Sequence, residues 1–337
     1  MKLHITILLV SLLSLCPVKA VPVRGETREW SRLDGNKVIG KLSEIHDESV
    51  TLKIKGRKYV ITINTLSAED IVYIKEMTPV PAAGTIGVYE AKFKNEAQKA
   101  YYEKHSIQSL EWKGKDPKEK LSFILYSPDP LKQGGKLPII IHLSGTGGIG
   151  NDNVKPLFED GGGVAKTFLS DKLQKRNPCH VMIPQPSRIG GWLGASYTEP
   201  ADNLAWTIIA LDHLLGNPSY NIDPDRIYIT GLSMGGGGVY HALAKFPNRF
   251  AAGIPVAWAE THELFHEVNV GSPMWIAVNS GDKGQPLDMI REFRREYQKL
   301  GGKARVTIYK AGGHDAWSKL LGDQKFRTWL FHRKLGE

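Results

Sequence analysis

The sequence predicts a two-domain chain: a small β-rich module, then an α/β domain whose mostly parallel sheet has helices on both faces. Three observations lead to this. Residues 28–77 contain three strand-like runs, and the last two alternate apolar and polar residues as half-buried strands do. From about residue 121, short apolar runs alternate with helical stretches, which is the pattern of a parallel sheet. Several of these runs are continuously apolar, as strands covered on both faces are.

The first twenty residues have the layout of a secretory signal peptide. Lys2 gives a positive start, an apolar run follows from Ile5 to Leu15, and the segment ends at Ala20. We therefore expect residues 1–20 to be removed and the protein to be secreted or periplasmic. Cleavage would leave Cys179 as the single cysteine, so no internal disulfide is expected. Its place before an apolar run predicts a buried, inert thiol.

The small module is expected over residues 25–78. Its predicted strands cover 38–42, 50–54 and 59–63, and Ser67 begins a capped helical turn. With Arg28-Glu29-Trp30 and Leu66-Ser67-Ala68-Glu69-Asp70, this segment resembles the SLA homology domain, a small SH3-like barrel. The resemblance implies a role in binding a protein or surface partner. Trp30 is expected in the core rather than on a ligand platform.

Residues 79–104 are predicted to be a linker followed by a helix. The linker is the Pro/Ala/Gly-rich stretch 78–84, and residues 88–104 are rich in Lys, Glu and Ala. The α/β domain then runs from 105 to 337. Its expected strands are 121–125, 138–142, 181–183, 226–230, 251–256, 274–278 and 306–309, with helices near 201–215, 234–245, 287–299 and 323–334.

The formal net charge is +9, and its lysines and arginines are scattered along the chain. They form no basic stripe interleaved with aromatic residues, so the sequence gives little support for nucleic-acid binding.

The strongest motif is Gly231-Leu232-Ser233-Met234-Gly235. An apolar strand-like run precedes it and a helical stretch follows it. A G-x-S-x-G motif between a strand and a helix is the context of a nucleophilic serine on a sharp turn, where side chains at either glycine would clash. The sequence therefore predicts Ser233 as a nucleophile.

A serine nucleophile needs a base, and the base needs an acid that orients it. His314 lies in a glycine loop directly after the last predicted strand, and we expect it to be the base. The acid should follow the 274–278 strand, where Asp282 is the carboxylate of the loop. Asp288, which is expected to open the next helix, is the alternative.

The oxyanion of the reaction needs two backbone N–H donors. One is expected from Met234, the residue after the nucleophile, and the other from Gly145 or Thr146 in the glycine-rich loop 142–153. A phosphate-binding loop is excluded here, because no Gly-Lys-Ser/Thr follows.

With these motifs, the second domain resembles exported α/β-hydrolase esterases of the feruloyl-esterase and polymer-depolymerase type. The resemblance covers nearly all of residues 121–335. It depends on the motifs Pro138–Ile141, Ile183–Pro186, Tyr220–Tyr228 with the Ser233 turn, and Gly312–Trp317. In two places the chain departs from the pattern: Ser144-Gly145 stands where the family usually carries His-Gly, and Gly284 stands at the acid's usual position. Asp282 would then serve from a shifted site, or the triad would be incomplete.

The resemblance implies a serine hydrolase that cleaves carboxylic esters, including acyl or feruloyl esters of polysaccharides, with no metal or organic cofactor. Its partner would be a small-molecule or polysaccharide ester. Two alternatives stay open: a serine peptidase of related fold, and a non-catalytic binding protein on a hydrolase scaffold.

Overall fold

The computed structural model describes residues 21–22, 27–45, 49–77, 84–128, 135–188, 191–193, 202–246, 248–261, 264 and 272–336. The expected signal peptide (1–20) and most of the expected linker lie outside these residues. The chain divides into two compact units, residues 1–80 and 81–337. Each unit is described by itself.

The smaller unit is an antiparallel sheet with one helix. Its described strands are ordered β1-β3-β4-β5, and β2 pairs with β3. The elements are β1 (Val21–Pro22), β2 (Thr27–Ser31), β3 (Lys37–Ile45), β4 (Ser49–Ile54), β5 (Arg57–Thr62), the 3₁₀ turn η1 (Ile63–Thr65) and α1 (Ala68–Met77). The SH3-like barrel expected from the sequence stays a prediction.

Trp30 lies in the core of this unit, as the sequence indicated. It is fully buried, and its indole N–H donates to the carbonyl oxygen of Gly40 at 2.9 Å. Its ring packs edge-on against Tyr73. The capped turn also forms, because the backbone N–H of Asp70 donates to Ser67 Oγ at 3.2 Å and begins α1.

The larger unit is built on a nine-stranded sheet ordered β14-β13-β12-β11-β9-β10-β8-β7-β6. The strands β9 to β14 are parallel, and β6, β7 and β8 join antiparallel at one end. Their bounds are β6 (Thr85–Val88), β7 (Gln108–Lys113), β8 (Lys120–Tyr126), β9 (Leu137–Leu143), β10 (His180–Pro184), β11 (Ile222–Leu232), β12 (Ala252–Val256), β13 (Met274–Asn279) and β14 (Ala304–Tyr309).

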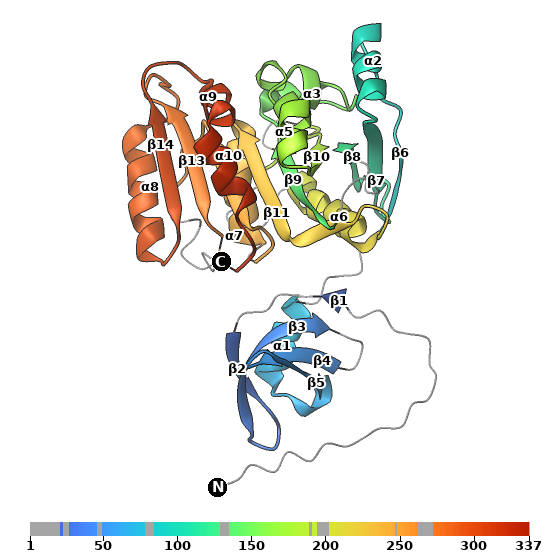
Figure 1. Ribbon diagram of the computed structural model, residues 1–337, viewed down its shortest axis with the longest axis vertical. Helices are drawn as coiled ribbons and strands as arrows, with labels where there is room; N and C mark the ends of the chain where they lie inside the picture. The colour runs from blue at the N-terminus through green and yellow to red at the C-terminus, as the bar shows by residue number, and fades with distance from the viewer. Residues whose placement is uncertain are drawn as a thin grey trace. The chain divides into compact units, whose positions relative to one another are not determined.

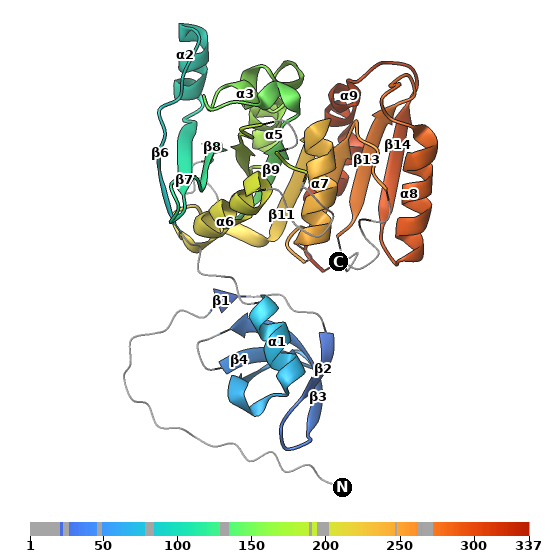
Figure 2. The same ribbon diagram turned by 180° about the vertical axis from the view of Figure 1, so that it is seen from behind.

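Helices cover both faces of this sheet. The helices α3, α5, α9 and α10 lie in front of it in Figure 1, whereas α6 and α7 lie in front in Figure 2. The helices are α2 (Glu96–Lys104), α3 (Lys155–Phe158), α4 (Lys166–Leu169), α5 (Asp171–Arg176), α6 (Asp202–Gly216), α7 (Met234–Lys245), α8 (Leu287–Lys299), α9 (Ala316–Gly322) and α10 (Gln324–Phe331), with 3₁₀ turns η3 (Thr146–Gly148) and η4 (Asp160–Gly162).

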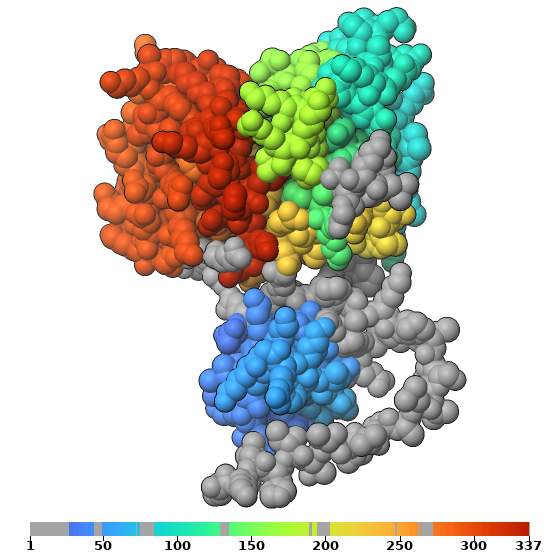
Figure 3. Space-filling model, viewed as in Figure 1, coloured from blue at the N-terminus to red at the C-terminus, as the bar shows by residue number. Residues whose placement is uncertain are grey.

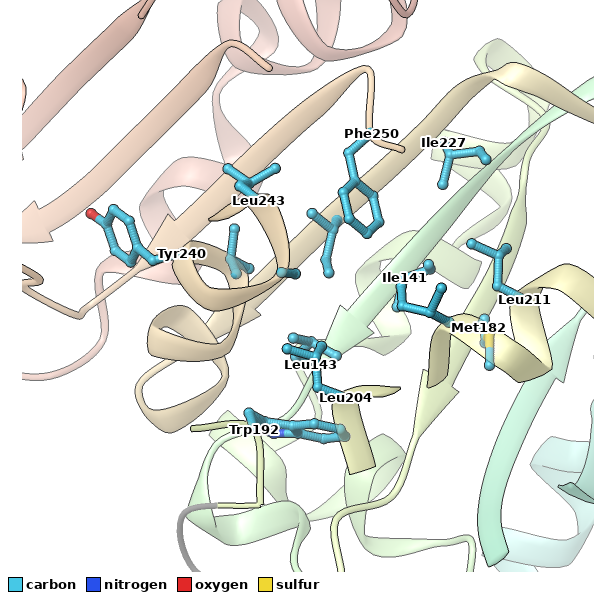
Figure 4. Close-up of a cluster of buried hydrophobic side chains, with 14 of the residues drawn as sticks. Ile141, Leu143, Met182, Trp192, Leu204, Leu211, Ile227, Tyr240, Leu243 and Phe250 are labelled. Carbon is cyan, nitrogen blue, oxygen red and sulfur yellow. The ribbon is translucent and has the colours of Figure 1, made fainter. Parts of the chain in front are cut away.

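Two hydrophobic cores follow from the alternation of side chains along the strands. In β9, Ile139 and Ile141 pack with α6, α7 and α8, whereas Ile140 packs with the helices of the opposite face. Figure 4 shows part of the first core, where Ile141 and Leu143 lie with Leu204 and Leu211 of α6 and Leu243 of α7. All seven residues of β9 are buried, which accounts for a sequence that is apolar apart from His142.

The larger unit begins earlier than the sequence indicated. The stretch 79–104 was expected to be a linker and a helix, but residues 85–88 form the edge strand β6 and the helix α2 begins only at Glu96. Asn95 caps that helix, because its side-chain oxygen accepts from Gln98 N at 3.0 Å. The strand β7 was also missed, since its sequence QSLEWK is half polar and resembles a loop.

Candidate active site

The candidate residues gather at the carboxyl ends of the parallel strands. Thr146 follows β9, Ser233 follows β11, Asp282 follows β13 and His314 follows β14. Parallel strands end at the same sheet edge, so four segments far apart in the sequence meet there. The order β13-β12-β11-β9 in the sheet brings their loops side by side.

Ser233 lies on a sharp turn between β11 and α7. Its backbone angles are φ 53° and ψ −123°, a region that a non-glycine residue adopts only under strain of about 1–3 kcal/mol. The flanking glycines make the turn possible. A Cβ at Gly231 would overlap the carbonyl oxygen of Gly235, and a Cβ at Gly235 would overlap the carbonyl oxygen of Leu143. The backbone N–H of Ser233 donates to Val256 O at 2.9 Å, which ties the turn to β12.

Ser233, His314 and Asp282 form a continuous hydrogen-bond chain. His314 Nε2 lies 2.7 Å from Ser233 Oγ, and His314 Nδ1 lies 2.6 Å from Asp282 Oδ2. The Asp282 side chain is 7% exposed and that of His314 is 44% exposed, so the acid is shielded while the imidazole faces the solvent. Asp288 takes no part in these hydrogen bonds, because its side chain is 96% exposed and pairs with Arg291.

The shifted acid position is accommodated by a tight turn. Asp282 N donates to Asn279 O at 3.2 Å, and Gly284 N donates to Asp282 Oδ1 at 3.1 Å. One carboxylate oxygen is therefore held by its own loop while the other reaches His314. The departure noted at Gly284 thus leaves a complete chain of contacts.

Asn279, at the end of β13, holds the loop that carries His314. It is fully buried, and its Nδ2 donates to Gly313 O at 2.8 Å and to Asp315 Oδ1 at 2.7 Å. Lys319 Nζ donates in turn to Asn279 Oδ1 at 2.9 Å. The carbonyl and carboxylate on either side of His314 are thereby fixed to the sheet. Sequence reasoning assigned Asn279 no role, because a buried asparagine at a strand end has no local signature.

The glycine-rich loop after β9 differs from expectation at one donor. Gly145 was expected as a candidate oxyanion donor, but its N–H donates to Asp160 Oδ2 at 3.0 Å and is buried there. Thr146 is exposed, and no acceptor among the described residues takes its N–H. Met234 begins α7, so its N–H lies at the positive end of the helix. Of the two alternatives on the loop after β9, Thr146 is therefore the one whose N–H is not taken by Asp160.

Asp160 belongs to a buried polar cluster beneath this loop that the sequence analysis missed. It is 1% exposed, and its carboxylate lies 4.0 Å from His142 Nε2. Burial raises the pKa of Asp160 to about 6 and lowers the pKa of His142 to about 4. Among the described residues neither His142 ring nitrogen nor Ser144 Oγ has a hydrogen-bond partner. The run of three glycines after Asp160, all with positive φ, is the sequence signal that could have drawn attention to it.

The described residues also place the single expected thiol and show what helices and acidic or histidine clusters they contain. Cys179 is fully buried, and burial raises the pKa of its thiol to about 12, so it is protonated at neutral pH. In the same residues no group of three or more His, Cys, Asp or Glu side chains is arranged to hold a metal ion. None of the helices described has the length and apolar character needed to cross a bilayer.

No protein-family model matches the sequence, and no curated protein matches it significantly. Solved structures do. A thermostable esterase superposes with a TM-score of 0.57 at 22% identity, over 93% of this chain and 94% of that one. A ferulic acid esterase (TM-score 0.47, 17% identity, 63% and 90% covered) and the glucuronoyl esterase from Solibacter usitatus (0.45, 16%, 66% and 81%) also match. The nine-stranded sheet and the likeness to the thermostable esterase identify the fold of the larger unit as that of the α/β-hydrolases.

Proposed function

We propose that the larger unit is a serine hydrolase of carboxylic esters, with Ser233 as nucleophile, His314 as general base and Asp282 as the acid that orients His314. One observation carries the proposal: the chain of contacts of 2.7 Å and 2.6 Å that joins the three side chains at the carboxyl edge of the sheet. Nucleophile, base and orienting group within hydrogen-bond reach are what acyl transfer requires.

The reaction would begin with the transfer of the Ser233 proton to His314 Nε2 as Oγ attacks the ester carbonyl. The N–H groups of Met234 and Thr146 would stabilise the tetrahedral oxyanion. His314 would then protonate the departing alcohol, which leaves an acyl-serine. Water attacks this intermediate, gives its proton to His314, and releases the carboxylic acid as the proton returns to Ser233. Asp282 stabilises the imidazolium of both steps.

Two other functions share part of this geometry. Peptide cleavage would use the same acyl-enzyme, and a non-catalytic binding protein would keep the hydrolase fold without the reaction. The binding protein is disfavoured because binding does not require the strained Ser233 backbone or an aligned acid and base. No contact in the described residues favours an amide over an ester.

A nitrophenyl ester series tests the proposal. Wild type should hydrolyse short acyl esters, and Ser233→Ala should lower kcat about 10⁵-fold or more, because it removes the nucleophile. A fluorophosphonate probe should label wild type at Ser233 and leave Ser233→Ala unlabelled. Equal hydrolysis by the two proteins would refute the proposal, and turnover of chromogenic peptides in preference to every ester would favour a peptidase.

We also propose that the protein is exported, with residues 1–20 as its signal peptide, and that the small unit binds a protein or surface partner. The sequence supports both: the apolar run after Lys2, and the resemblance of residues 28–70 to the SLA homology domain. Esters of polysaccharides fit an exported enzyme. N-terminal sequencing of the mature protein tests export, and a start at any residue other than Val21 would contradict the predicted cleavage.

A further inference from the structure

A groove of about 480 Å³ lies beside the His314 loop. Its walls come from the glycine turn 161–163, the segment from α4 to α5, and the helices α9 and α10. In Figure 3 the surfaces of α5 (lime) and of α9 and α10 (red) lie side by side on this face. Trp317 joins the groove to the candidate active site, because it lines the groove and packs edge-on against His314 with ring centroids 5.8 Å apart.

The charged side chains that line this groove are all basic. Lys172, Arg176 and Arg327 line it, and among the residues that the structure describes no aspartate or glutamate does. Within the described part of the chain, none of the three cations has an ion-pair partner. Arg327 Nη1 donates to Leu321 O at 2.6 Å, which fixes one donor of its guanidinium. Its other donors are not taken by any described acceptor.

Helix stability does not explain this arrangement. Lys172 and Arg176 are four residues apart on α5, so they share a face of the helix, where like charges are mutually destabilising. The helix dipole favours Arg176 in the last turn but disfavours Lys172 in the first. The helix therefore gives no reason for Lys172 and Arg176 to share a face, and an anionic ligand between them would offset their mutual repulsion.

The rest of the lining combines apolar side chains, among them Val164 and Leu173, with polar ones that can bind hydroxyl groups. Thr167, Ser170, Asn177 and Ser318 contribute small polar side chains, and Trp317 contributes an indole. Ser170 Oγ donates to Thr167 O at 2.7 Å and Ser318 Oγ donates to Asp315 O at 3.0 Å, so both oxygens keep lone pairs for a ligand donor. Carboxylate-binding cations beside hydroxyl partners and an aromatic ring match the chemistry of an acidic sugar.

We propose that this groove binds the carboxylate-bearing residues of an acidic oligosaccharide whose ester bond is presented to Ser233. The proposal names a substrate class for the proposed esterase, and it rests on that function for the hydrolysis of the bound oligosaccharide. The binding step itself does not depend on catalysis.

Isothermal titration calorimetry with the Ser233→Ala protein tests binding without turnover. Trigalacturonate is the anionic probe and maltotriose the neutral one, both at low salt. Trigalacturonate should bind with an affinity that falls as salt rises, because charge attraction is screened. Replacing Lys172 and Arg176 together by Gln should raise its Kd about tenfold or more, since each cation supplies a charge-assisted hydrogen bond.

A matched control removes the same charge elsewhere. Arg294→Gln with Lys303→Gln also deletes two exposed cations, but neither residue lines the groove or belongs to α5, so the Kd for trigalacturonate should stay within twofold of the parent. Loss of binding in the control pair equal to that in the groove pair would overturn the proposal. So would absence of trigalacturonate binding, tighter binding of maltotriose, or equal competition by tripolyphosphate, which would indicate a general polyanion site.

The hydrolysis of neutral nitrophenyl acetate by wild type is measured in parallel. If wild type does not hydrolyse it while trigalacturonate binding depends on Lys172 and Arg176, the proposed function fails and the groove assignment holds. If hydrolysis is present and binding is indifferent to both cations, the groove assignment alone fails.

Discussion

Gly145 donates its backbone N–H to the buried carboxylate of Asp160 at 3.0 Å, and this contact links the loop after β9 to the turn that opens η4. A Cβ at Gly147 would also lie 3.2 Å from the Cα of Asp160, so the two segments pack backbone to backbone. Asp160 therefore positions the loop in which Thr146 presents its N–H. The same contact removes Gly145 from the set of oxyanion donors.

Asp160→Ala should release this loop and lower kcat for nitrophenyl esters about 10²-fold. A misplaced oxyanion donor stabilises the transition state no better than an absent one. Asp160→Asn keeps an oxygen that can accept from Gly145 and should retain most of the activity. Michaelis kinetics of the two variants measure the difference, with KM expected to change less than kcat. An alanine variant with the kcat of wild type would exclude the positioning role.

Asp282→Asn should lower kcat about 10⁴-fold with little change in stability, because the amide can no longer orient and stabilise a protonated His314. Asp288→Asn is the matched control: the carboxylate is 96% exposed and pairs only with Arg291 on its own helix. It should keep the activity of wild type. Loss of activity in Asp288→Asn with none in Asp282→Asn would reverse the assignment of the acid.

Gly235→Ala should destabilise or misfold the larger unit, since its Cβ would overlap the carbonyl oxygen of Leu143 in the neighbouring strand. Thermal unfolding followed by circular dichroism measures the effect. Gly216→Ala is the control, because that glycine ends α6 and a Cβ there would meet no atom within 4 Å. The control should be neutral or stabilising by up to about 1 kcal/mol. Comparable melting of the two variants would contradict the close packing at the turn.

The larger unit should lose stability as the pH falls from about 6.5 to 4. Burial lowers the pKa of His142, His180 and His241 to about 4 each, so these side chains stay neutral in the folded state while the unfolded chain takes up protons. The raised pKa of Asp160 acts in the opposite direction between about 6 and 3.8, because its carboxyl binds a proton more readily when folded. Burial also raises the pKa of Asp212 and of Glu260, which act in the same direction as Asp160. The shifts of the three histidines are the larger ones, so the net effect is a loss of stability.

Urea unfolding at pH 7, 6 and 5 measures this dependence. His142→Gln should flatten the slope by up to about 1.4 kcal/mol per pH unit, the linkage of one proton. A slope in His142→Gln as steep as that of wild type would show that His142 does not titrate as its burial indicates.

Trp30→Ala should unfold the small unit and spare hydrolysis by the larger one. The side chain is fully buried in a core of six buried hydrophobic residues, and its loss costs about 3–5 kcal/mol, which a unit this small can hardly withstand. Limited proteolysis should digest the N-terminal unit of the variant and leave the remainder intact. Leu33→Ala, at a side chain that is 74% exposed, should resist digestion like wild type.

The sequence by itself predicted the class of the fold and the three side chains that the structure brings into contact at the sheet edge. Apolar runs such as Ile139–Ile141 predicted buried parallel strands, because burial on both faces favours apolar side chains. The motif around Ser233 predicted the turn, because only glycine fits at 231 and 235 when two backbones approach so closely. His314 was found because the order of strands in the chain limits where a base can lie.

Only the tertiary structure decided which polar groups meet. Asp282 and Asp288 were both candidates from the sequence, and the tight turn at Asn279–Gly284 separates them by placing one against His314 and the other in solvent. The contacts of Asp160 and Asn279 could not be found in advance, because each side chain reaches a backbone group 15 or 34 residues away. Local sequence encodes propensity and burial, whereas a contact across the sheet edge exists only once the strands have taken their order.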